Sequence, residues 1–362
     1  MTIFSEGADF MTKRALCLLA AAAALLCCAA LFVSRPGGGA EPAVSENFRL
    51  GTFVRLSLYD CGNADEELAK GDELIKSLEN LFSVNIPTSD VARLNAAGGA
   101  WTRIDARTAE LLETSLALAE LTGGAFSPAL GGVTALWRIG TPEARVPSDG
   151  EIAEALKYTD YSKIELRVED GAHFARLPRG MRLDLGAIAK GCVADALKSR
   201  FAADGVRRAM IDLGGNLDFV GESPRGGPWR AGLQQPERPR GEYFGIIEAE
   251  DVSVVTSGPY ERYFEKDGVR YHHIIDPATG RPARSGLSSV TVVDANSARA
   301  DALCTALFVM GSRRAPEFLE RRGDVRAVLV TDDKRVLITP SAEKIFRLTD
   351  ESLALSVIGA GE

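Results

Sequence analysis

Two of the three histidines in this chain, His272 and His273, stand next to each other. They lie in R-Y-H-H-I-I-D-P-A-T-G-R, residues 270–281, where Asp-Pro and Thr-Gly predict a sharp turn directly after a strand. Because successive side chains of a strand point to opposite faces, one imidazole can face the interior while the other faces a cleft. An imidazole held there suits proton transfer near neutral pH. The alternative is a pair of surface histidines in a loop, and this segment alone does not decide between the two.

An acid and an alcohol, Asp301 and Thr305, stand four residues apart in S-A-R-A-D-A-L-C-T-A-L-F-V-M-G. In the helix predicted there, residues four apart lie on one face, so these two side chains are one above the other. A carboxylate and a hydroxyl in this arrangement both offer oxygen to a hard cation such as Mg²⁺. The alternative is a solvated polar stripe on an amphipathic helix.

A third segment, D-L-G-A-I-A-K-G at residues 184–191, predicts a strand that passes through a glycine turn into a helix. Backbone N–H groups at a helix N-terminus favour phosphate, and Lys190 lies close enough to assist. The spacing matches neither the Walker phosphate loop nor the Rossmann glycine fingerprint. The predicted strand end Thr256-Ser257-Gly258 adds two hydroxyls, which either hold a phosphate or form a turn.

These residues need strands and helices to position them, and strand patterns dominate the second half of the chain. Consecutive strands are often close enough to form hairpins, which favours an α+β fold with largely antiparallel sheets flanked by helices over a doubly wound parallel fold. The expected strands cover residues 54–59, 163–168, 181–185, 208–213, 243–248, 253–257, 288–293, 326–330 and 335–338.

Helical periodicity predicts one helix capped by Asn63 and three more over residues 108–122, 187–203 and 297–310. Ser148 and Glu151 form a capping box for a short helix. Two connecting segments are expected to be loops. Residues 87–95 are polar, whereas residues 124–137 are so apolar and rich in glycine that we expect them to line a cavity.

The composition limits the classes of function. A chain of 362 residues with 46% hydrophobic and 25% charged residues is typical of a folded globular protein. Its formal net charge of -8, without a basic run, gives no support for a nucleic-acid partner. Beyond the N-terminal segment the cysteines are Cys61, Cys192 and Cys304, with no Cys-x-x-Cys pair, so we expect no zinc site.

Residues 1–40 are predicted to be a separate signal or anchor segment with its linker. Lys13 and Arg14 precede an uncharged run over residues 15–33, and about 20 apolar residues suffice to cross a bilayer. This pattern predicts a secretory signal or a retained membrane helix, with the body in the periplasm or at the outer face of the cell membrane. Lipidation at Cys27 or Cys28 ranks below a retained helix, because residues 24–26 lack the small residue that such processing prefers.

Five segments, taken in order, resemble the ApbE family of FAD:protein FMN transferases. They are L-F-S-V-N-I-P-T-S-D-V-A-R-L-N, G-A-F-S-P-A-L-G-G-V-T-A-L-W, L-D-L-G-A-I-A-K-G-C-V-A-D, V-V-T-S-G-P-Y-E-R-Y-F with Y-H-H-I-I-D-P-A-T-G-R-P, and A-D-A-L-C-T-A-L-F-V-M-G. Each segment is modest alone, but five in the right order are highly specific. The resemblance runs from about Leu50 to the C-terminal strands and implies an ApbE-like domain over residues 45–350.

The resemblance implies a function as well as a fold. Proteins of this family bind FAD and Mg²⁺, and they transfer the FMN moiety to a Ser or Thr hydroxyl of a target flavoprotein. The product is a phosphoester, and AMP is released. A body tethered to the membrane outside the cytoplasm is also typical of the family. We find no flavinylation acceptor motif in this chain, so the expected target is another protein.

The family's residue roles carry over to matching positions of this chain. The backbone carbonyl of Ala187, together with Asp301 and Thr305, would hold the metal ion, and His273 would be the catalytic residue. The remaining matched positions would bind the flavin nucleotide, with Ala125 and Phe126 facing FAD from the apolar segment. These cofactor-binding positions are Ala125, Phe126, Ser127, Asp184, Lys190, Ser257, Gly258, His273 and Ile274.

Three positions depart from the family pattern. Ser127 stands where an aspartate is usual, Asn85 stands near a position that is often aromatic, and Leu50 replaces a methionine. These changes affect the adenine and flavin contacts that the resemblance implies, but not the metal pair or His273. Two alternatives therefore stay open. One is an FAD pyrophosphatase that uses the same site with water as acceptor, and the other is a flavin-binding protein without turnover.

Overall fold

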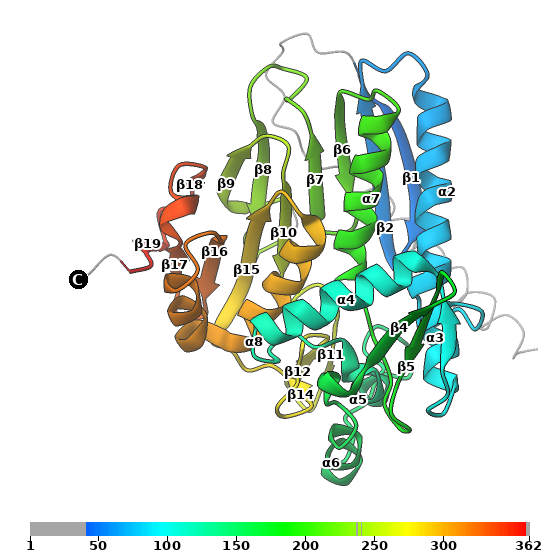
Figure 1. Ribbon diagram of the computed structural model, residues 1–362. Coiled ribbons are helices and arrows are strands. Elements are labelled where there is room, and N and C mark those ends of the chain that lie inside the picture. The colour runs from blue at the N-terminus through cyan, green and yellow to red at the C-terminus, as the bar shows by residue number, and fades with distance from the viewer. Residues whose placement is uncertain (1–40, 237, 240, 360–362) are drawn as a thin grey trace, which may run out of the picture.

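A nine-stranded sheet forms the centre of the molecule in the computed structural model, which describes residues 41–236, 238–239 and 241–359 (Figure 1). Neighbouring strands are antiparallel throughout, except that the last two are parallel. In spatial order the strands are β1 (Ala43–Arg49), β2 (Thr52–Tyr59), β6 (Arg208–Asp212), β7 (Asn216–Val220), β10 (Ser253–Ser257), β15 (Leu287–Asp294), β16 (Arg326–Thr331), β17 (Arg335–Ile338) and β19 (Ala354–Val357).

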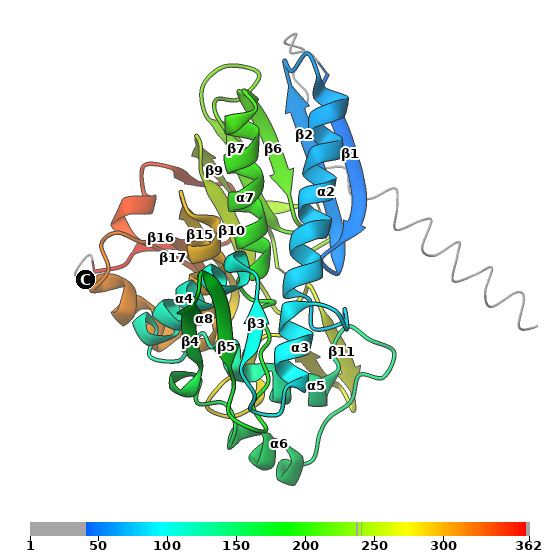
Figure 2. The same ribbon diagram turned by 45° about the vertical axis from the view of Figure 1, so that its right-hand side comes forward.

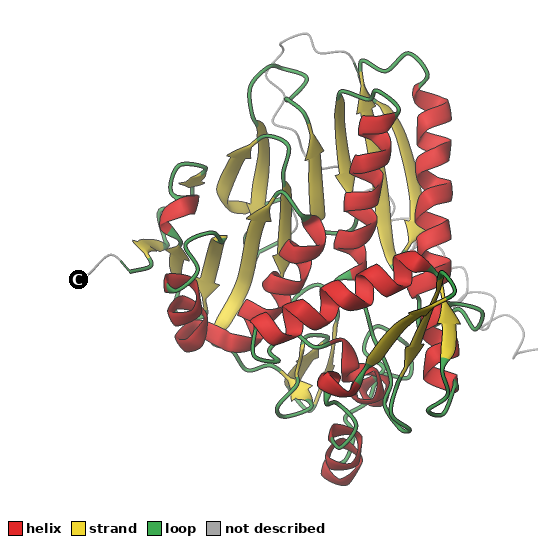
Figure 3. Ribbon diagram, viewed as in Figure 1, coloured by secondary structure: helices red, strands yellow, loops and turns green. Residues whose placement is uncertain are grey.

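Three helices cover one face of this sheet, α2 (Ala64–Phe82), α7 (Ala189–Ala203) and α8 (Ser297–Glu320) (Figure 3). Their apolar stripes bury residues such as Ile75, Leu197 and Leu303, none of which is measurably exposed. Burial of apolar area on this scale is the main term that holds the helices to the sheet. The layer matters for function because it sets α7 directly beside α8.

The opposite face of the large sheet is covered by a smaller antiparallel sheet. Its strands, in spatial order, are β18 (Phe346–Leu348), β9 (Tyr243–Ala249) and β8 (Trp229–Gln234). Trp229 stacks on Phe219 of the large sheet with ring centroids 5.1 Å apart, inside a second hydrophobic core. This side of the molecule is therefore a β-sandwich, whereas the helical side carries the predicted chemistry.

The remaining elements gather at one end of the molecule, toward the bottom in Figures 1 and 2. A third hydrophobic core lies here, built around Trp137 and Ile275. The helices at this end are α3 (Asp90–Ala96), α4 (Ala106–Leu121), α5 (Gly131–Trp137) and α6 (Asp149–Leu156), with the 3₁₀ turns η1 (Pro128–Leu130) and η2 (Tyr161–Lys163). The strands are β3 (Thr102–Ile104), β4 (Glu165–Glu169) and β5 (Ala172–Arg176), with the hairpins β11 (Tyr263–Lys266)–β12 (Val269–His272) and β13 (Ile275–Asp276)–β14 (Arg281–Pro282).

The α+β class with largely antiparallel sheets is confirmed, and β10 and β17 have the predicted bounds. The capping box of Ser148 and Glu151 is also present. Asn63 precedes α2 as expected, but its side chain donates to Glu67 at 2.9 Å instead of capping a helix N–H. Strands whose patterns were not recognised include β1, β5, β7 and β8.

Three local predictions were wrong. The polar segment 87–95 contains the start of α3, which Ser89 caps by accepting the Ala92 N–H at 2.9 Å. Residues 124–137 are not an open loop but contain η1 and α5. Residues 181–185 are extended without being a strand of a sheet. Instead, the side-chain amide of Asn95 pairs with both the N–H and the carbonyl of Leu183, at 2.7 and 3.0 Å.

The helix predicted over residues 297–310 is longer than expected, because α8 continues to Glu320 through a bend at Gly311. Gly311 has φ +78°, and a Cβ there would lie 2.5 Å from the Ser285 carbonyl, so the bend requires glycine. The predicted signal or anchor segment, residues 1–40, lies outside the described residues. Within the residues that are described, none of the helices is long and apolar enough to cross a membrane.

Candidate active site

The N-terminal ends of α7 and α8 meet at Gly191. A Cβ on Gly191 would lie 2.3 Å from the Ser297 carbonyl oxygen, so only glycine permits this approach. Asp195 of α7 also accepts the backbone N–H groups of Ser297 and Ala298, at 2.8 and 2.9 Å. A carboxylate at this position stabilises the N-terminus of α8. Two helices are thereby held together at their N-terminal ends. They are α7, which follows Ala187, and α8, which carries Asp301 and Thr305.

Asp301 is buried at this junction, with 3% of its surface exposed. Its Oδ2 accepts the Gly191 backbone N–H at 3.1 Å. The alternative of a solvated polar stripe is therefore wrong for Asp301, since its neighbours on α8 are buried as well. A buried carboxylate needs hydrogen bonds or a cation to offset its lost hydration, and the single contact from Gly191 leaves further oxygen lone pairs available.

The three predicted metal-binding residues lie on the two segments that meet at this junction. Ala187 lies just before α7, and its carbonyl accepts no hydrogen bond from any residue within the described ranges, because the Gly191 N–H turns to Asp301 instead. Thr305 lies one turn after Asp301 and is half-buried. A carbonyl, a carboxylate and a hydroxyl form an all-oxygen set of the kind that suits Mg²⁺.

This oxygen set contains only one protein carboxylate. Accordingly, the described part of the chain contains no group of three or more His, Cys, Asp or Glu residues placed to hold a metal ion. Mg²⁺ is often bound by one or two carboxylates, with substrate phosphates and waters completing its coordination. The residues present therefore fit a cation that is held jointly by the protein and a phosphorylated substrate.

The two adjacent histidines have different surroundings. His272, at the end of β12, is buried, and its Nε2 lies 3.0 Å from the Ala283 carbonyl. Its Nδ1 accepts the Ile274 backbone N–H at 3.3 Å. A carbonyl can only accept, so His272 carries its proton on Nε2 and uses both ring nitrogens in the core. Burial lowers the pKa of His272, which keeps it neutral. His272 is therefore a structural residue.

His273 follows the strand and is half-exposed. Its backbone N–H and its Nδ1 both face the Arg262 carbonyl, at 3.1 and 3.2 Å. Burial of the ring, and then the charge of Arg262, lower the pKa of His273 to about 3. The imidazole is therefore neutral at pH 7 and able to accept a proton. One of the two histidines, His272, faces the interior as expected, whereas a cleft beside His273 stays a prediction.

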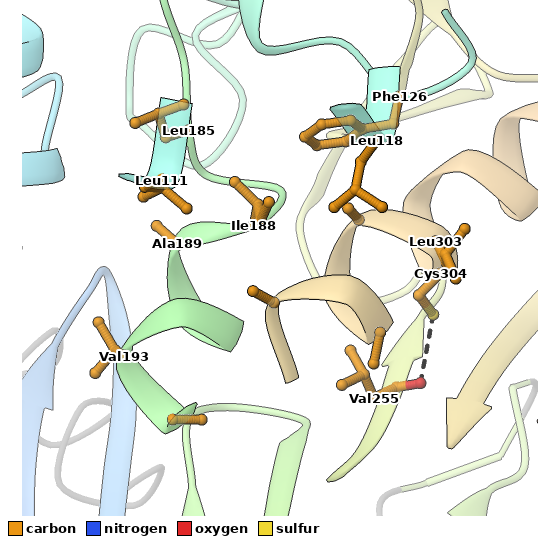
Figure 4. Close-up of a cluster of buried hydrophobic side chains, with 14 of the residues drawn as sticks. Leu111, Leu118, Phe126, Leu185, Ile188, Ala189, Val193, Val255, Leu303 and Cys304 are labelled. Atoms are coloured by element: carbon orange, nitrogen blue, oxygen red, sulfur yellow. Dashed lines mark hydrogen bonds between the residues drawn. The ribbon is translucent and has the colours of Figure 1, made fainter. Parts of the chain in front are cut away.

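Lys190, Ser257 and Asp301 all influence one buried thiol, that of Cys304 on α8. Cys304 donates to the Val290 carbonyl at 3.0 Å. It also donates to the Val255 carbonyl at 3.4 Å (Figure 4). Burial raises the pKa of this thiol to about 12, with smaller effects from Ser257, Asp301 and Lys190. Lys190 also contributes to the low pKa of His273. The charge of Lys190 therefore acts on both the thiol in the middle of α8 and the imidazole directly after β12.

Asp184 links the α7 segment to the apolar segment. Its Oδ2 accepts the Thr134 hydroxyl at 2.8 Å, and its Oδ1 accepts the Gly186 N–H at 2.9 Å. The Asp184 N–H in turn donates to the Pro128 carbonyl at 2.9 Å. The two segments expected to bind the nucleotide are therefore held side by side, although they are about 50 residues apart in sequence.

The apolar segment itself is packed into the core. The Phe126 ring is 2% exposed and lies among core residues that include Leu118 and Leu303 (Figure 4). Ala125 and Ser127 are also buried, and the Ser127 hydroxyl accepts the Ala129 N–H at 3.2 Å. The expectation that this segment lines a cavity is wrong, because these side chains fill the space themselves.

The other predicted cofactor-binding residues lie close to these elements. Gly258 follows β10, and a Cβ there would lie 2.4 Å from the Tyr260 ring. Ile274 is buried directly after His273, and its carbonyl accepts the Ala283 N–H at 2.9 Å. Two cavities of about 160 and 140 Å³ lie elsewhere, and neither is lined by a predicted site residue.

Two contributors to the site were missed from the sequence. The first is the turn at residues 212–215, whose Gly215 carbonyl accepts the Thr256 N–H at 3.3 Å and so adjoins the end of β10. Its D-L-G-G pattern, similar to D-L-G-A at residues 184–187, was an available signal. The second is Arg262, whose carbonyl positions His273. Sequence offered no comparable signal for a backbone carbonyl, because any residue type supplies one.

The sequence of this chain is similar to those of known proteins. The sequence pattern of the ApbE family matches residues 50–329. An FAD:protein FMN transferase of Treponema pallidum is 39% identical over 322 residues, which cover 84% of this chain and 89% of that protein. An FAD:protein FMN transferase of Klebsiella pneumoniae is 36% identical over 292 residues, covering 80% and 89% of the two chains.

Solved structures resemble the fold as well as the sequence. An ApbE protein from Thermotoga maritima matches with a TM-score of 0.78 and 32% identity, over 85% of this chain and all of that one. The flavinyl transferase ApbE of Pseudomonas stutzeri, in its apo form, matches with a TM-score of 0.71 and 28% identity, over 89% and 99%. The family match over residues 50–329 includes α2, α7, α8 and all of the candidate site residues.

Proposed function

The chain belongs to the ApbE family, and from that premise we propose that it transfers FMN from FAD to a Ser or Thr hydroxyl of a target flavoprotein, with Mg²⁺ as the metal. The observation that carries the proposal is the junction of α7 and α8. There, buried Asp301 accepts the N–H of Gly191, four residues after Ala187, whose carbonyl accepts no hydrogen bond from a described residue, and the charge of Lys190 acts on His273. These are the groups that displacement at a pyrophosphate requires, namely oxygen ligands for a cation, a fixed positive charge and a neutral base.

His273 acts as the base in this proposal. Its Nδ1 faces a carbonyl, so its Nε2 carries the lone pair that takes the proton from the acceptor hydroxyl. The hydroxyl oxygen bonds to the phosphorus of the FMN moiety, the bond from that phosphorus to the bridging oxygen breaks, and AMP leaves. Lys190 offsets the negative charge on the phosphate oxygens.

The metal site is assigned to the Ala187 carbonyl, Asp301 and Thr305. When bound, Mg²⁺ would neutralise negative charge on the pyrophosphate as the leaving group departs. The protein's own part is to hold Asp301 in place through the Gly191 N–H, so that the carboxylate is oriented before the substrate arrives. Backbone N–H groups at the start of α7 add a favourable potential for phosphate.

A transfer assay tests this proposal. The full-length chain, FAD, Mg²⁺ and a flavinylation-domain acceptor are incubated, and flavin fluorescence is measured on the acceptor after denaturation. We expect a covalently fluorescent acceptor with the wild type and none with His273→Ala. The control is His173→Ala, which changes the remaining histidine of the chain, on β5, and should label the acceptor like the wild type. Absence of labelling with every acceptor tried contradicts the transferase proposal.

Hydrolysis of FAD to FMN and AMP is the alternative that the same site serves. His273 is half-exposed, so water can reach the base when no acceptor is bound. AMP release without an acceptor separates the two activities. If an acceptor does not increase the rate of AMP formation, the main activity is hydrolysis of FAD. Storage without turnover is excluded if the wild type transfers or hydrolyses FAD, whereas His273→Ala binds FAD equally well but does neither.

We also propose that the body is held outside the cytoplasm by its N-terminal segment. The uncharged run over residues 15–33, preceded by Lys13 and Arg14, supports this proposal. Cell fractionation with protease treatment of intact spheroplasts tests it. Recovery of the protein in the membrane fraction with a protease-accessible body is expected, whereas a fully protected body contradicts it.

A further inference from the structure

Arg262 lies between β10 and β11 and touches His273 through its backbone. Its carbonyl accepts the His273 backbone N–H at 3.1 Å and faces His273 Nδ1 at 3.2 Å. A carbonyl oxygen carries no proton, so Nδ1 must be the donor and the neutral ring must be protonated there. Arg262 therefore determines which nitrogen of His273 is free, and that nitrogen is Nε2.

The guanidinium group of Arg262 acts on His273 through its charge. The residue is exposed, and its side chain forms no ion pair with a carboxylate among the residues at 41–236, 238–239 and 241–359. Its Cδ lies near the turn at Gly140, 3.8 Å from the position of a Cβ there. Its charge nevertheless acts on the imidazole, since it is the second cause of the low pKa of His273 after burial.

A second cation, Lys190, acts on the same ring and likewise forms no ion pair with a described carboxylate. Arg270, on the hairpin that follows Arg262, is unlike both of them. It pairs with Glu265 at 3.1 Å and lies 4.2 Å above the centroid of the Tyr263 ring. Two unpaired cations beside one neutral base leave a local excess of positive charge, which an anionic ligand can neutralise.

We propose that Arg262 is a positioning residue of this site that also binds substrate. Its carbonyl holds His273 with Nε2 free, and its guanidinium binds a non-bridging oxygen of the dinucleotide pyrophosphate, on the side of the base. The inference rests on the proposed function, because it needs a pyrophosphate in the site. The planar guanidinium offers paired N–H donors that match phosphate oxygens, which makes arginine suited to this contact.

This arrangement also has a consequence for the timing of proton transfer. Without substrate, the two cations and burial keep His273 unprotonated but weakly basic. When pyrophosphate neutralises Arg262 and Lys190, the repulsion between these cations and a protonated ring falls. His273 then becomes a stronger base at the moment when the acceptor hydroxyl must lose its proton. Binding of the nucleotide and activation of the base are thus coupled through Arg262.

Binding of inorganic pyrophosphate tests the charge contact. Calorimetry on the full-length chain compares wild type, Arg262→Ala, Arg262→Lys and Arg270→Ala, with thermal unfolding as a check on folding. A charge-assisted contact of this kind is worth about tenfold or more in affinity. We expect Arg262→Ala to weaken pyrophosphate binding by about that factor, Arg262→Lys to recover part of it, and Arg270→Ala to bind like the wild type. Riboflavin, which lacks phosphate, should bind all four proteins equally.

Two results would overturn the charge contact. One is an Arg262→Ala variant that binds pyrophosphate within about twofold of the wild type. The other is an equal loss in Arg270→Ala, which would indicate a general surface charge effect. If the wild type binds neither pyrophosphate nor FAD, the proposed function itself fails. If the wild type transfers FMN and Arg262→Ala binds pyrophosphate and transfers FMN equally well, only this inference fails.

The tautomer is tested separately by ¹⁵N NMR of the imidazoles at pH 7. We expect His273 to be protonated at Nδ1 and His272 at Nε2, with His273→Ala used to assign the signals. A His273 that is protonated mainly at Nε2 contradicts the role of the Arg262 carbonyl. Kinetics add a third measurement, because Arg262→Ala should raise KM for FAD and also lower kcat, whereas loss of binding alone would change KM only.

Discussion

The backbone N–H of Gly191 donates to the buried carboxylate of Asp301 at 3.1 Å, across 110 residues of sequence. This contact ties the start of α7 to the first turns of α8, where the two helices approach so closely that a Cβ on Gly191 would meet the Ser297 carbonyl. It also takes the Gly191 N–H away from the Ala187 carbonyl, which is left free. One glycine thus permits the packing, orients the acid and exposes the carbonyl that we assign to the proposed metal site.

Gly191→Ala should therefore damage both stability and activity. The added methyl meets backbone atoms at 2.3–2.6 Å, so α7 and α8 must move apart. We expect the free energy of unfolding to fall by about 1–3 kcal/mol and transfer to be largely lost. Urea unfolding and the transfer assay measure the two effects. Gly150→Ala in α6, where a Cβ meets nothing within 4 Å, is the matched control and should retain full activity. Equal behaviour of the two variants would contradict the role of Gly191.

Asp301→Ala should cost folding stability as well as metal affinity, because the residue is buried and its loss leaves the Gly191 N–H without an acceptor. We expect the metal-free protein to lose about 1–3 kcal/mol of unfolding free energy. Asp301→Asn keeps an acceptor oxygen, so it should lose less stability and yet still bind Mg²⁺ poorly. Thermal unfolding without metal and calorimetric titration of Mg²⁺ in the presence of pyrophosphate check both points. An alanine variant as stable as the asparagine variant would count against the Gly191 contact.

His272→Ala and His273→Ala should separate structure from chemistry. His272 is buried, uses both ring nitrogens and contacts the Phe308 ring edge-on at 5.6 Å. Its replacement should lower the unfolding free energy by about 2–4 kcal/mol. His273→Ala should stay within about 1 kcal/mol of the wild type but lose transfer. Melting curves beside the transfer assay show the contrast, and a stable, inactive His272→Ala would reverse the assignment.

Asp218 should make stability depend on pH. It is buried between the hydroxyls of Ser253 and Ser297, and burial raises its pKa to about 7 from an ordinary 3.8. The folded state therefore holds a proton that the unfolded state releases, so this group's contribution to stability is complete below about pH 4 and is lost as pH rises through 7. From 1.36 kcal/mol per pKa unit, the loss is about 4 kcal/mol at most.

Asp218→Asn removes this titration while keeping groups that can bond to the same hydroxyls. We expect the difference in unfolding free energy between pH 5 and pH 8 to shrink in the variant, mainly through a gain in stability at pH 8. Urea unfolding at the two pH values measures it. A variant whose pH dependence matches that of the wild type would show that the carboxyl is already charged in the folded state at pH 5.

Phe126 tests whether the apolar segment acts through packing. Because its ring lies in the core, Phe126→Ala should cost about 3–5 kcal/mol of unfolding free energy. Phe126→Leu keeps most of the volume and should cost less than about 1.5 kcal/mol, with FAD affinity close to that of the wild type. A stable leucine variant with much weaker FAD binding would instead assign the ring a direct contact with the flavin.

The sequence by itself determined the family, the α+β class and most of the long helices. Patterns such as the apolar stripe of α2 and the alternation in β10 depend on residues a few positions apart, so they survive without knowledge of the fold. The residues to which we assign the proposed chemistry, His273, Lys190, Asp301 and Thr305, were recognisable because their types stand in ordered motifs. Local signals failed where short apolar or polar stretches fit more than one element, as at residues 87–95 and 181–185.

Only the tertiary structure decided how these residues are used. The helical spacing of Asp301 and Thr305 suggested a solvated face, but the approach of α7 buries Asp301 and supplies its hydrogen bond. The sequence predicted different surroundings for the two neighbouring histidines, but only the carbonyls of Ala283 and Arg262 show which ring nitrogen of each carries the proton. Burial, backbone hydrogen bonds and the field of distant charges all come from groups far away in sequence, and a linear pattern carries no information about which of them will meet.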